Sequence, residues 1–237
     1  MIISESSRFI LFSMEKTGTS SMDEALGGYF DQRKYRARLD KTLPLLWRIR
    51  SRLGRLARFR GKQPPTDCWN DEPGLKHCPP RWLFQQRHVL LAGNDWDSFF
   101  KACFVRNPLD RLLSVYSFHT QKIPHIYPEA LAAGSFRNWL ESGGTGSAKK
   151  SMKAFVTDEA GQVLPDFIGR YENLSRDWRY FLERAGLGSI VLPEVSATKT
   201  SHADWREVWS NELLEIFLAN RVWKADFEFF GYDAVVN

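Results

Sequence analysis

The sequence predicts an α/β fold, a single domain with a central, mostly parallel sheet flanked by helices. Residues 9–13 form a short apolar run that is followed by a Gly-containing turn and a helical pattern. The same order of strand, turn and helix returns over residues 102–119. Short buried strands that alternate with helices are typical of parallel sheets. Ligands of such sheets bind where the strands feed the helices, so both turns are candidate sites.

The composition is that of one globular domain. The 237 residues are 43% hydrophobic and 14% aromatic, with nine Trp, so burial of large side chains can offset the entropy lost on folding. The sequence contains no signal-peptide pattern and no apolar window of about 18 residues, which favours a cytoplasmic protein. Cys68, Cys78 and Cys103 show no metal-ligand spacing, and we expect reduced thiols and no metal site.

Two strand-to-helix units are predicted in detail. In the first, residues 19–29 carry apolar side chains at helical spacing, namely Met22, Ala25 and Leu26. In the second, a strand over residues 102–105 is followed by Asn107 and Pro108, which favour a helix start. One face of this second helix carries Leu112, Val115, Tyr116 and His119.

The central part of the chain predicts a hairpin and a helix. Residues 154–157 and 163–168 have the pattern of two hairpin strands around a turn. Residues 174–185 form an apolar helical stripe that ends at Gly186. The Gly- and Ser-rich residues 142–151 are predicted to form a mobile loop.

The C-terminal part predicts one more strand and a final helix. The strand covers residues 189–192. The helix begins at the cap Ser210. Its buried face is predicted to contain Leu213, Leu214, Phe217 and Val222.

The turn after the first strand has the composition of an anion-binding loop. Its residues are Lys16, Thr17, Gly18, Thr19, Ser20 and Ser21. Backbone N–H groups at a helix start, together with hydroxyls and a Lys, can bind phosphate or sulfate oxygens. An ordinary turn with Ser and Thr caps is the alternative. The loop is not a Walker A motif, because that motif places its Lys after the glycines.

Four segments in order resemble the sulfotransferases that use 3′-phosphoadenosine 5′-phosphosulfate (PAPS), especially the carbohydrate-directed group called sulfotransferase family 2. These segments are KTGTSS, FVRNPLDRLLSVY, DFIGRYENLSRDWRYFLERAGL and ADFEFFGYD. The resemblance implies a P-loop-NTPase-like sulfotransferase fold over residues 1–237, with a basic helical insertion around residues 33–62. It also implies PAPS as the donor and a hydroxyl of a glycan or glycolipid as the acceptor.

The resemblance implies roles for the residues of the two loops. Residues 16–21 would bind the 5′-phosphosulfate, with Lys16 at the oxygen that bridges phosphate and sulfate. Arg106 and Ser114 would bind the 3′-phosphate, which suits the planar fork of an arginine at the end of a strand. Alternatively, Arg106 pairs with Asp110 and Ser114 bonds its own helix.

The general base is less well defined by the sequence. Many relatives have Pro before the loop Lys, whereas this chain has Glu15, which could face solvent, pair with Lys16 or act as a base. His77, which follows Lys76, is the first candidate base, Glu15 the second and His202 the third. A surface His in a Pro-rich loop is the alternative for His77. Thr198 and Lys199 lie in a loop that resembles a substrate-proximal or nucleotide-covering segment of relatives; a solvated Lys is the alternative.

Positive charge is concentrated in one segment. Residues 33–62 contain twelve Lys and Arg and one acid, a net charge of +11, whereas the chain totals +5 and its remainder is therefore about −6. Residues 43–60 have the pattern of a cationic amphipathic helix. This helix could contact the inner membrane surface or an acidic glycan, or simply pack with its arginines in solvent. Two rival functions are a P-loop-like kinase and a non-enzymatic polyanion-binding protein; nucleic acid is not an expected partner.

Overall fold

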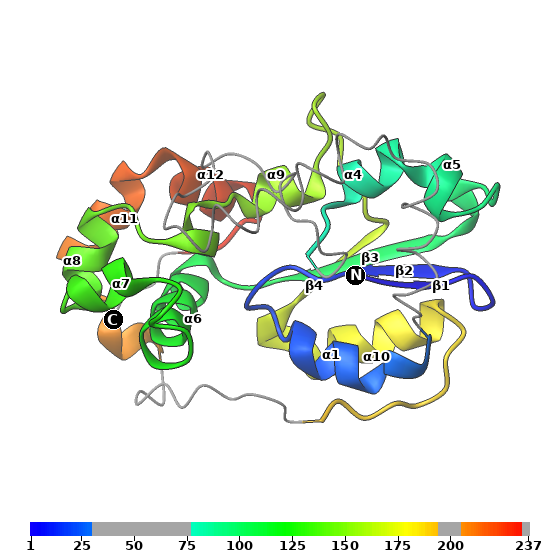
Figure 1. Ribbon diagram of the computed structural model, residues 1–237, viewed down its shortest axis with the longest axis horizontal. Helices are drawn as coiled ribbons and strands as arrows, with labels where there is room; N and C mark the ends of the chain where they lie inside the picture. Colours follow the sequence, from blue (N-terminus) through cyan, green and yellow to red (C-terminus); the bar gives the residue numbers. More distant parts are fainter. Residues whose placement is uncertain (30–76, 194–204, 234–237) are drawn as a thin grey trace.

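The computed structural model describes residues 1–29, 77–193 and 205–233. Its centre is a four-stranded sheet in the order β1 (Ile2–Ser4), β2 (Phe9–Phe12), β3 (Phe100–Val105) and β4 (Phe167–Arg170). The β2, β3 and β4 strands are parallel, and β1 pairs antiparallel to β2 at the edge (Figure 1). The predicted α/β fold with a mostly parallel sheet is confirmed.

Both faces of the sheet are buried. Along β2 and β3, Phe9, Leu11, Ala102 and Phe104 belong to one hydrophobic cluster. The intervening Ile10, Phe12, Cys103 and Val105 belong to the other. Successive side chains of a strand point to opposite faces, so this alternation places one apolar layer on each side.

Helices cover the two faces and extend the molecule beyond the sheet (Figure 1). One face is covered by α1 (Thr19–Ala25) and α10 (Leu174–Arg184), the other by α4 (Pro80–Gln85), α5 (Arg87–Leu90) and α9 (Met152–Val156). A helical lobe beyond the carboxyl ends of the strands contains α6 (Pro108–Gln121), α7 (Pro128–Ala132), α8 (Phe136–Glu141), α11 (Asn211–Ala219) and α12 (Arg221–Phe229). Short 3₁₀ turns are η1 (Gly27–Tyr29), η3 (Trp96–Ser98), η4 (Gly146–Lys149), η5 (Tyr171–Asn173) and η6 (Trp205–Val208).

The α6 helix begins where the sequence predicts. Pro108 occupies the first turn, and the Asn107 side chain accepts a hydrogen bond from the Leu109 N–H. Most of the helix is buried, including Leu112, Val115 and His119. The helix therefore runs from the end of β3 into the helical lobe and connects the two parts of the core.

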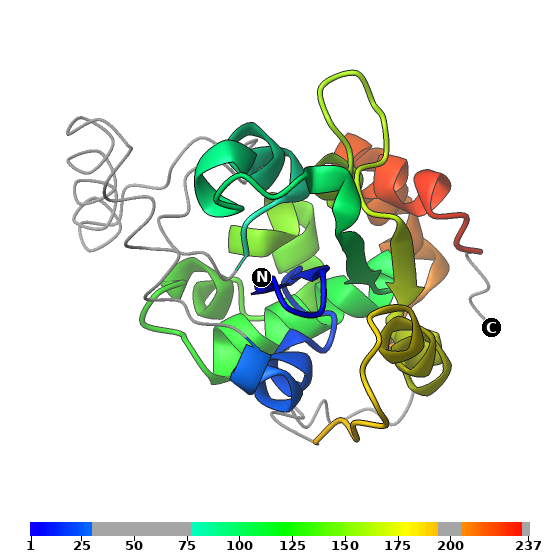
Figure 2. The same ribbon diagram turned by 90° about the vertical axis from the view of Figure 1, so that its right-hand side faces the viewer.

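The predicted hairpin is wrong in its first arm. Residues 152–156 form α9, and only an isolated bridge joins Thr157 to Val163; Figure 2 shows the connection that follows as a projecting loop. The Asp226 carboxylate of α12 accepts the N–H groups of Met152 and Lys153, which satisfies the start of α9. The second arm contributes β4, which pairs parallel to β3 and not to a hairpin partner.

Two further expectations differ from the structure, and the structure adds one strand. Residues 189–192 form no strand, and the Ile190 carbonyl accepts a hydrogen bond from the Trp178 indole N–H. Residues 142–151, predicted to form a mobile loop, contain the turn η4 and are held against α6, beside which Thr145 and Ser147 are buried. The β1 strand is an addition that the sequence did not reveal.

The C-terminal segment contains two helices in place of the one predicted. Ser210 caps α11 through the Leu213 N–H, as expected. Asn220 then caps α12 through the N–H groups of Val222 and Trp223. Phe217 is fully buried, whereas Leu213, Leu214 and Val222 are partly buried against the core.

Several predictions lie outside the described residues. They concern the basic insertion at 33–62, its helix at 43–60, Cys68, Thr198, Lys199 and His202. The other two cysteines, Cys78 and Cys103, are buried free thiols. Among the helices that the structure describes, none is long and apolar enough to cross a bilayer.

Candidate functional site

The two candidate loops lie side by side at one edge of the sheet. In the parallel register of β2 and β3, Phe12 is opposite Cys103, so the chain leaves both strands at the same edge. The guanidinium of Arg106 donates to the Lys16 carbonyl across a 3.3 Å distance from Nη1. The loops after β2 and β3 are therefore in direct contact.

The loop after β2 has a defined backbone conformation. Lys16 and Gly18 have positive φ angles of 69° and 83°, the region that favours glycine. Between them, the buried Thr17 hydroxyl donates to the Met14 carbonyl at 3.0 Å. Thr19 begins α1 and is buried, whereas Ser20 and Ser21 are partly buried. The loop is folded back on itself by its own hydroxyl group.

The Lys16 side chain faces the helical lobe. Its ammonium lies 4.2 Å from the ring centre of Phe118 on α6, a cation–π contact. Burial, followed by repulsion from Arg106, lowers the Lys16 pKa to about 8, although Glu15 opposes the shift. A partly desolvated cation of this kind binds an anion more strongly than a solvated one.

Arg106 is held by several groups at once. Nε and Nη2 donate to the two carboxylate oxygens of Asp110 at 2.6 and 2.8 Å, so the ion pair considered from the sequence is present. The guanidinium also lies over the Tyr171 ring, 4.3 Å from its centre. Of the five N–H groups of a guanidinium, the contacts to Asp110 and to the Lys16 carbonyl use three. Arg106 can thus keep these partners and still donate to an added phosphate.

Ser114 lies on the helix that Arg106 precedes. It is buried and follows Asn107 by two helical turns, so Asn107, Asp110 and Ser114 recur along one side of α6. The structure places Ser114 on the same helix side as the partner of Arg106.

Glu15 points into the protein and is paired. Its carboxylate lies 3.7 Å from the Lys150 ammonium. Burial alone would raise its pKa, but Lys150, His77, the Ser147 hydroxyl and Arg111 together lower it. Glu15 is therefore an ionised, weakly basic carboxylate beside the loop.

His77 is joined to the end of β2. Its Nδ1 lies 2.8 Å from the Ser13 carbonyl oxygen. A carbonyl oxygen can only accept, so Nδ1 carries the proton, and in the neutral form of the ring Nε2 is the acceptor. His77 also lowers the Glu15 pKa electrostatically, so two of the three candidate bases lie near each other.

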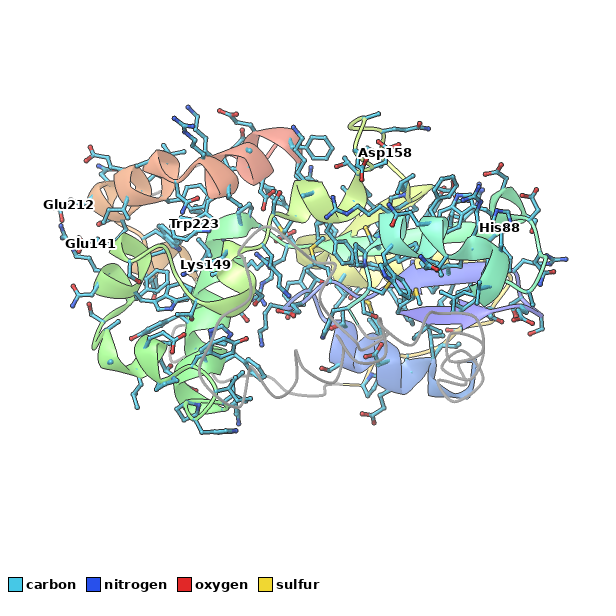
Figure 3. The ribbon with its side chains drawn as sticks, turned by 45° about the horizontal axis from the view of Figure 1, so that its top comes forward. His88, Glu141, Lys149, Asp158, Glu212 and Trp223 are labelled. Carbon is cyan, nitrogen blue, oxygen red and sulfur yellow. The ribbon has the colours of Figure 1, made fainter. Side chains whose placement is uncertain are left out.

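The remaining histidines differ from His77. His88 on α5 and His125 after α6 are exposed, and Figure 3 shows His88 at the opposite end of the molecule from Glu141 and Glu212. His119 is buried, with Nδ1 at 2.7 Å from the Thr145 hydroxyl. Burial lowers the His119 pKa to about 4, with a smaller opposing effect from Glu15.

Sequence reasoning did not identify three charged groups around the site. Arg111 is buried and donates to the carbonyls of Glu15 and Ser147. Lys150 comes from the segment expected to be mobile, and Glu172 accepts the Asn107 N–H. The available signals were the second arginine of RNPLDR, the Lys-Lys pair after the Gly-rich segment, and the acid of RYEN.

Comparison with known proteins identifies the family. Residues 1–233 match the model described as the Sulfotransferase family. Searches of curated proteins and of solved structures found no match. The family match covers nearly the whole chain, including both loops and the C-terminal segment, and it agrees with the resemblance to the family 2 group. With its α/β fold and its two adjoining loops, the chain belongs to the sulfotransferase family.

Proposed function

We propose that this sulfotransferase transfers a sulfuryl group from PAPS to a hydroxyl of a carbohydrate acceptor, a glycan or a glycolipid. The observation that carries the proposal is the direct contact of the two loops, made by the Arg106 guanidinium and the Lys16 carbonyl at 3.3 Å. A donor with phosphate groups at both ends of its ribose needs cationic groups at two neighbouring places. Lys16 and Arg106 are two such groups.

In the proposed complex, the two loops bind different ends of the donor. Residues 16–21 bind the 5′-phosphosulfate, and Arg106 with Ser114 binds the 3′-phosphate. Lys16 neutralises the oxygen that bridges phosphorus and sulfur. The protein needs no covalent intermediate for this chemistry, because positioning and charge neutralisation supply most of the catalysis of such transfers.

The proposed base is His77. The acceptor oxygen forms a bond to sulfur while the bond from sulfur to the bridging oxygen breaks, and the hydroxyl proton passes to Nε2 of His77. The hydrogen bond from Nδ1 to the Ser13 carbonyl supports this role, since it leaves Nε2 as the acceptor. Glu15 is a weaker second candidate, because its pairing with Lys150 and its lowered pKa reduce its basicity.

The carbohydrate acceptor is supported by the resemblance to family 2, and a metal ion has no role in the proposed chemistry. The basic residues 33–62 lie outside the described structure. We include them in the proposal as a surface for an acidic glycan or for the headgroups of an inner membrane. Liposome flotation with and without anionic lipid tests the membrane version, which unchanged recovery in the two cases would reject.

Calorimetric titration tests the donor assignment. The protein should bind 3′-phosphoadenosine 5′-phosphate (PAP), the product that remains after transfer, much more tightly than ATP. Equal binding of the two nucleotides, or no binding, would refute the assignment.

Substitutions separate the two loops. Lys16→Ala should lower the transfer rate by about 10²- to 10³-fold, the usual effect of removing a group that stabilises a developing oxyanion. Arg106→Ala should mainly raise the KM for the donor. Lys122→Ala, at an exposed position after α6, is the control and should leave both parameters unchanged.

A further inference from the structure

The turn η5 lies between the two loops that contact each other. The Tyr171 ring is stacked under the Arg106 guanidinium at 4.3 Å. On the other loop, a Cβ added to Gly18 would lie 3.3 Å from the same ring, a tight contact. One aromatic side chain thus touches the loop after β2 and the loop after β3.

The next residue holds the backbone beside Arg106. One carboxylate oxygen of Glu172 accepts the N–H of Asn107, the residue that directly follows Arg106. The Asn107 side chain in turn caps α6. Although Glu172 is exposed overall, its carboxylate is therefore tied to the peptide that orients Arg106.

The other carboxylate oxygen of Glu172 is bound by the C-terminal segment. The Tyr232 hydroxyl donates to it at 3.1 Å. Burial raises the pKa of the Tyr232 phenol, with a further contribution from Glu172, so the hydroxyl remains a donor at neutral pH. Arg170 supports Tyr232, because it lies over the Tyr232 ring and donates to the Phe230 carbonyl at 2.6 Å. The two oxygens of one carboxylate thus join the segment after α12 to the loop after β3.

We propose that Tyr171, Glu172 and Tyr232 are positioning residues that make the site selective for a nucleotide with a 3′-phosphate. The inference rests on the proposed function and adds the cause of its donor selectivity. A guanidinium that binds phosphate through two N–H groups depends strongly on orientation. Loss of the Glu172 carboxylate removes the acceptor of the Asn107 N–H, and loss of the Tyr232 hydroxyl leaves that carboxylate without its second hydrogen bond. Either change misaligns Arg106. The loop of residues 16–21 is anchored by the hydrogen bond from the Thr17 hydroxyl to the Met14 carbonyl, which involves neither Glu172 nor Tyr232, and it stays in place.

The test measures the contribution of the 3′-phosphate alone. Calorimetric titration gives the Kd of PAP and of AMP, which lacks only that phosphate, and the ratio of the two values is the readout. The variants are Tyr232→Phe, Glu172→Gln and Glu172→Ala. The matched control is Tyr180→Phe, which removes the hydroxyl of an exposed tyrosine on α10.

The expected result is a smaller ratio with unchanged AMP affinity. Tyr232→Phe and Glu172→Gln should each reduce the ratio about 3- to 10-fold, less than the full value of a hydrogen bond to a charged group, because the lost bond acts on the phosphate only through Arg106. Glu172→Ala, which removes both hydrogen bonds, should reduce it further, and Tyr180→Phe should leave it unchanged. In turnover, the KM for the donor should rise while kcat stays constant.

Three other results would contradict the inference or the proposed function. An unchanged ratio in Glu172→Ala, with the protein still folded by circular dichroism, overturns the inference. Equal weakening of PAP and AMP also overturns it, because a general structural role would act on both ligands. A wild-type protein that binds PAP no better than AMP refutes the proposed function itself, and the wild-type titration alone reveals that case.

Discussion

At the scale of single residues, the protonation state of Lys16 connects the geometry to a pH dependence. Burial, followed by repulsion from Arg106, lowers its pKa to about 8. The ammonium is the form that neutralises the leaving oxygen, and kcat/KM reports the free enzyme. We therefore expect kcat/KM to fall as the pH rises through about 8. A bound, negatively charged donor raises the Lys16 pKa, so kcat should stay constant to higher pH.

A substitution identifies the residue responsible for this pH profile. Arginine remains protonated at every pH of the assay. Lys16→Arg should therefore have a lower rate but no decline of kcat/KM near pH 8. The measurement is the initial rate of transfer as a function of pH for both proteins. If the decline persists unchanged in Lys16→Arg, another group causes it.

His77 is expected to act on the chemical step and not on donor binding. His77→Ala should lower kcat by about 10²- to 10⁴-fold, the range for removal of a general base, with the Kd of PAP unchanged. Steady-state kinetics and calorimetry provide the two values. His125→Ala, at an exposed position, should have no effect. A larger loss in Glu15→Gln than in His77→Ala would transfer the role of base to Glu15.

At the scale of elements, Asp226 shows how one helix is stabilised by another. It is a buried residue of α12 whose carboxylate accepts the Ser151 hydroxyl and the N–H groups of Met152 and Lys153. Asp226→Ala should lower the free energy of unfolding by about 2–3 kcal/mol, because it removes a cap and leaves buried donors without an acceptor. Ser210→Ala, which removes the local cap of α11, should cost about 1 kcal/mol. Urea denaturation measures both values, and equal losses would contradict the larger role assigned to Asp226.

The contact between Asp226 and the start of α9 illustrates which elements could be predicted from the sequence and which could not. The β2 and β3 strands and the start of α6 follow from local signals, an apolar run and an Asn-Pro pair. The α9 helix was mistaken for a strand although Ser151 caps it locally through the Ala154 N–H; the Asp226 carboxylate, which accepts the N–H groups of Met152 and Lys153, lies far along the chain. Phe155 and Val156 favour a strand when only local propensity is considered. Distant capping groups are invisible to a pattern that extends over a few residues.

In the candidate site too, some residues are indicated by local sequence signals and others are not. Lys16 and Arg106 could be named as candidates from the sequence because each lies in a distinctive loop after a strand. Lys150 and Glu172 were missed because their positions near these loops depend on how separate segments pack. Arg106 has the Asp110 pair that the sequence offered as an alternative, yet the pair leaves donors on the guanidinium. The ion pair with Asp110 and the proposed binding of a phosphate by Arg106 are therefore compatible.

At the scale of the whole molecule, the site connects the sheet to the helical lobe. The loop of residues 16–21 follows β2, whereas Phe118, under the Lys16 ammonium, belongs to α6 of the lobe (Figure 1). The C-terminal segment reaches the loop after β3 through Tyr232 and Glu172. A nucleotide bound at Lys16 and Arg106 would therefore contact residues attached to both the sheet and the helical lobe.

This arrangement predicts that PAP stabilises the whole chain. A ligand that binds only the folded state at 100 times its Kd adds about 2.7 kcal/mol to the free energy of unfolding. For a chain of 237 residues this corresponds to an increase in Tm of about 5–10 °C. Thermal denaturation followed by circular dichroism should show one cooperative transition that moves to higher temperature with PAP. AMP at the same concentration should move it less, and Arg106→Ala should remove the difference between the two nucleotides. The transition could instead split in two, with only one part shifted by PAP. This result would mean that PAP stabilises only one part of the molecule, the sheet or the helical lobe.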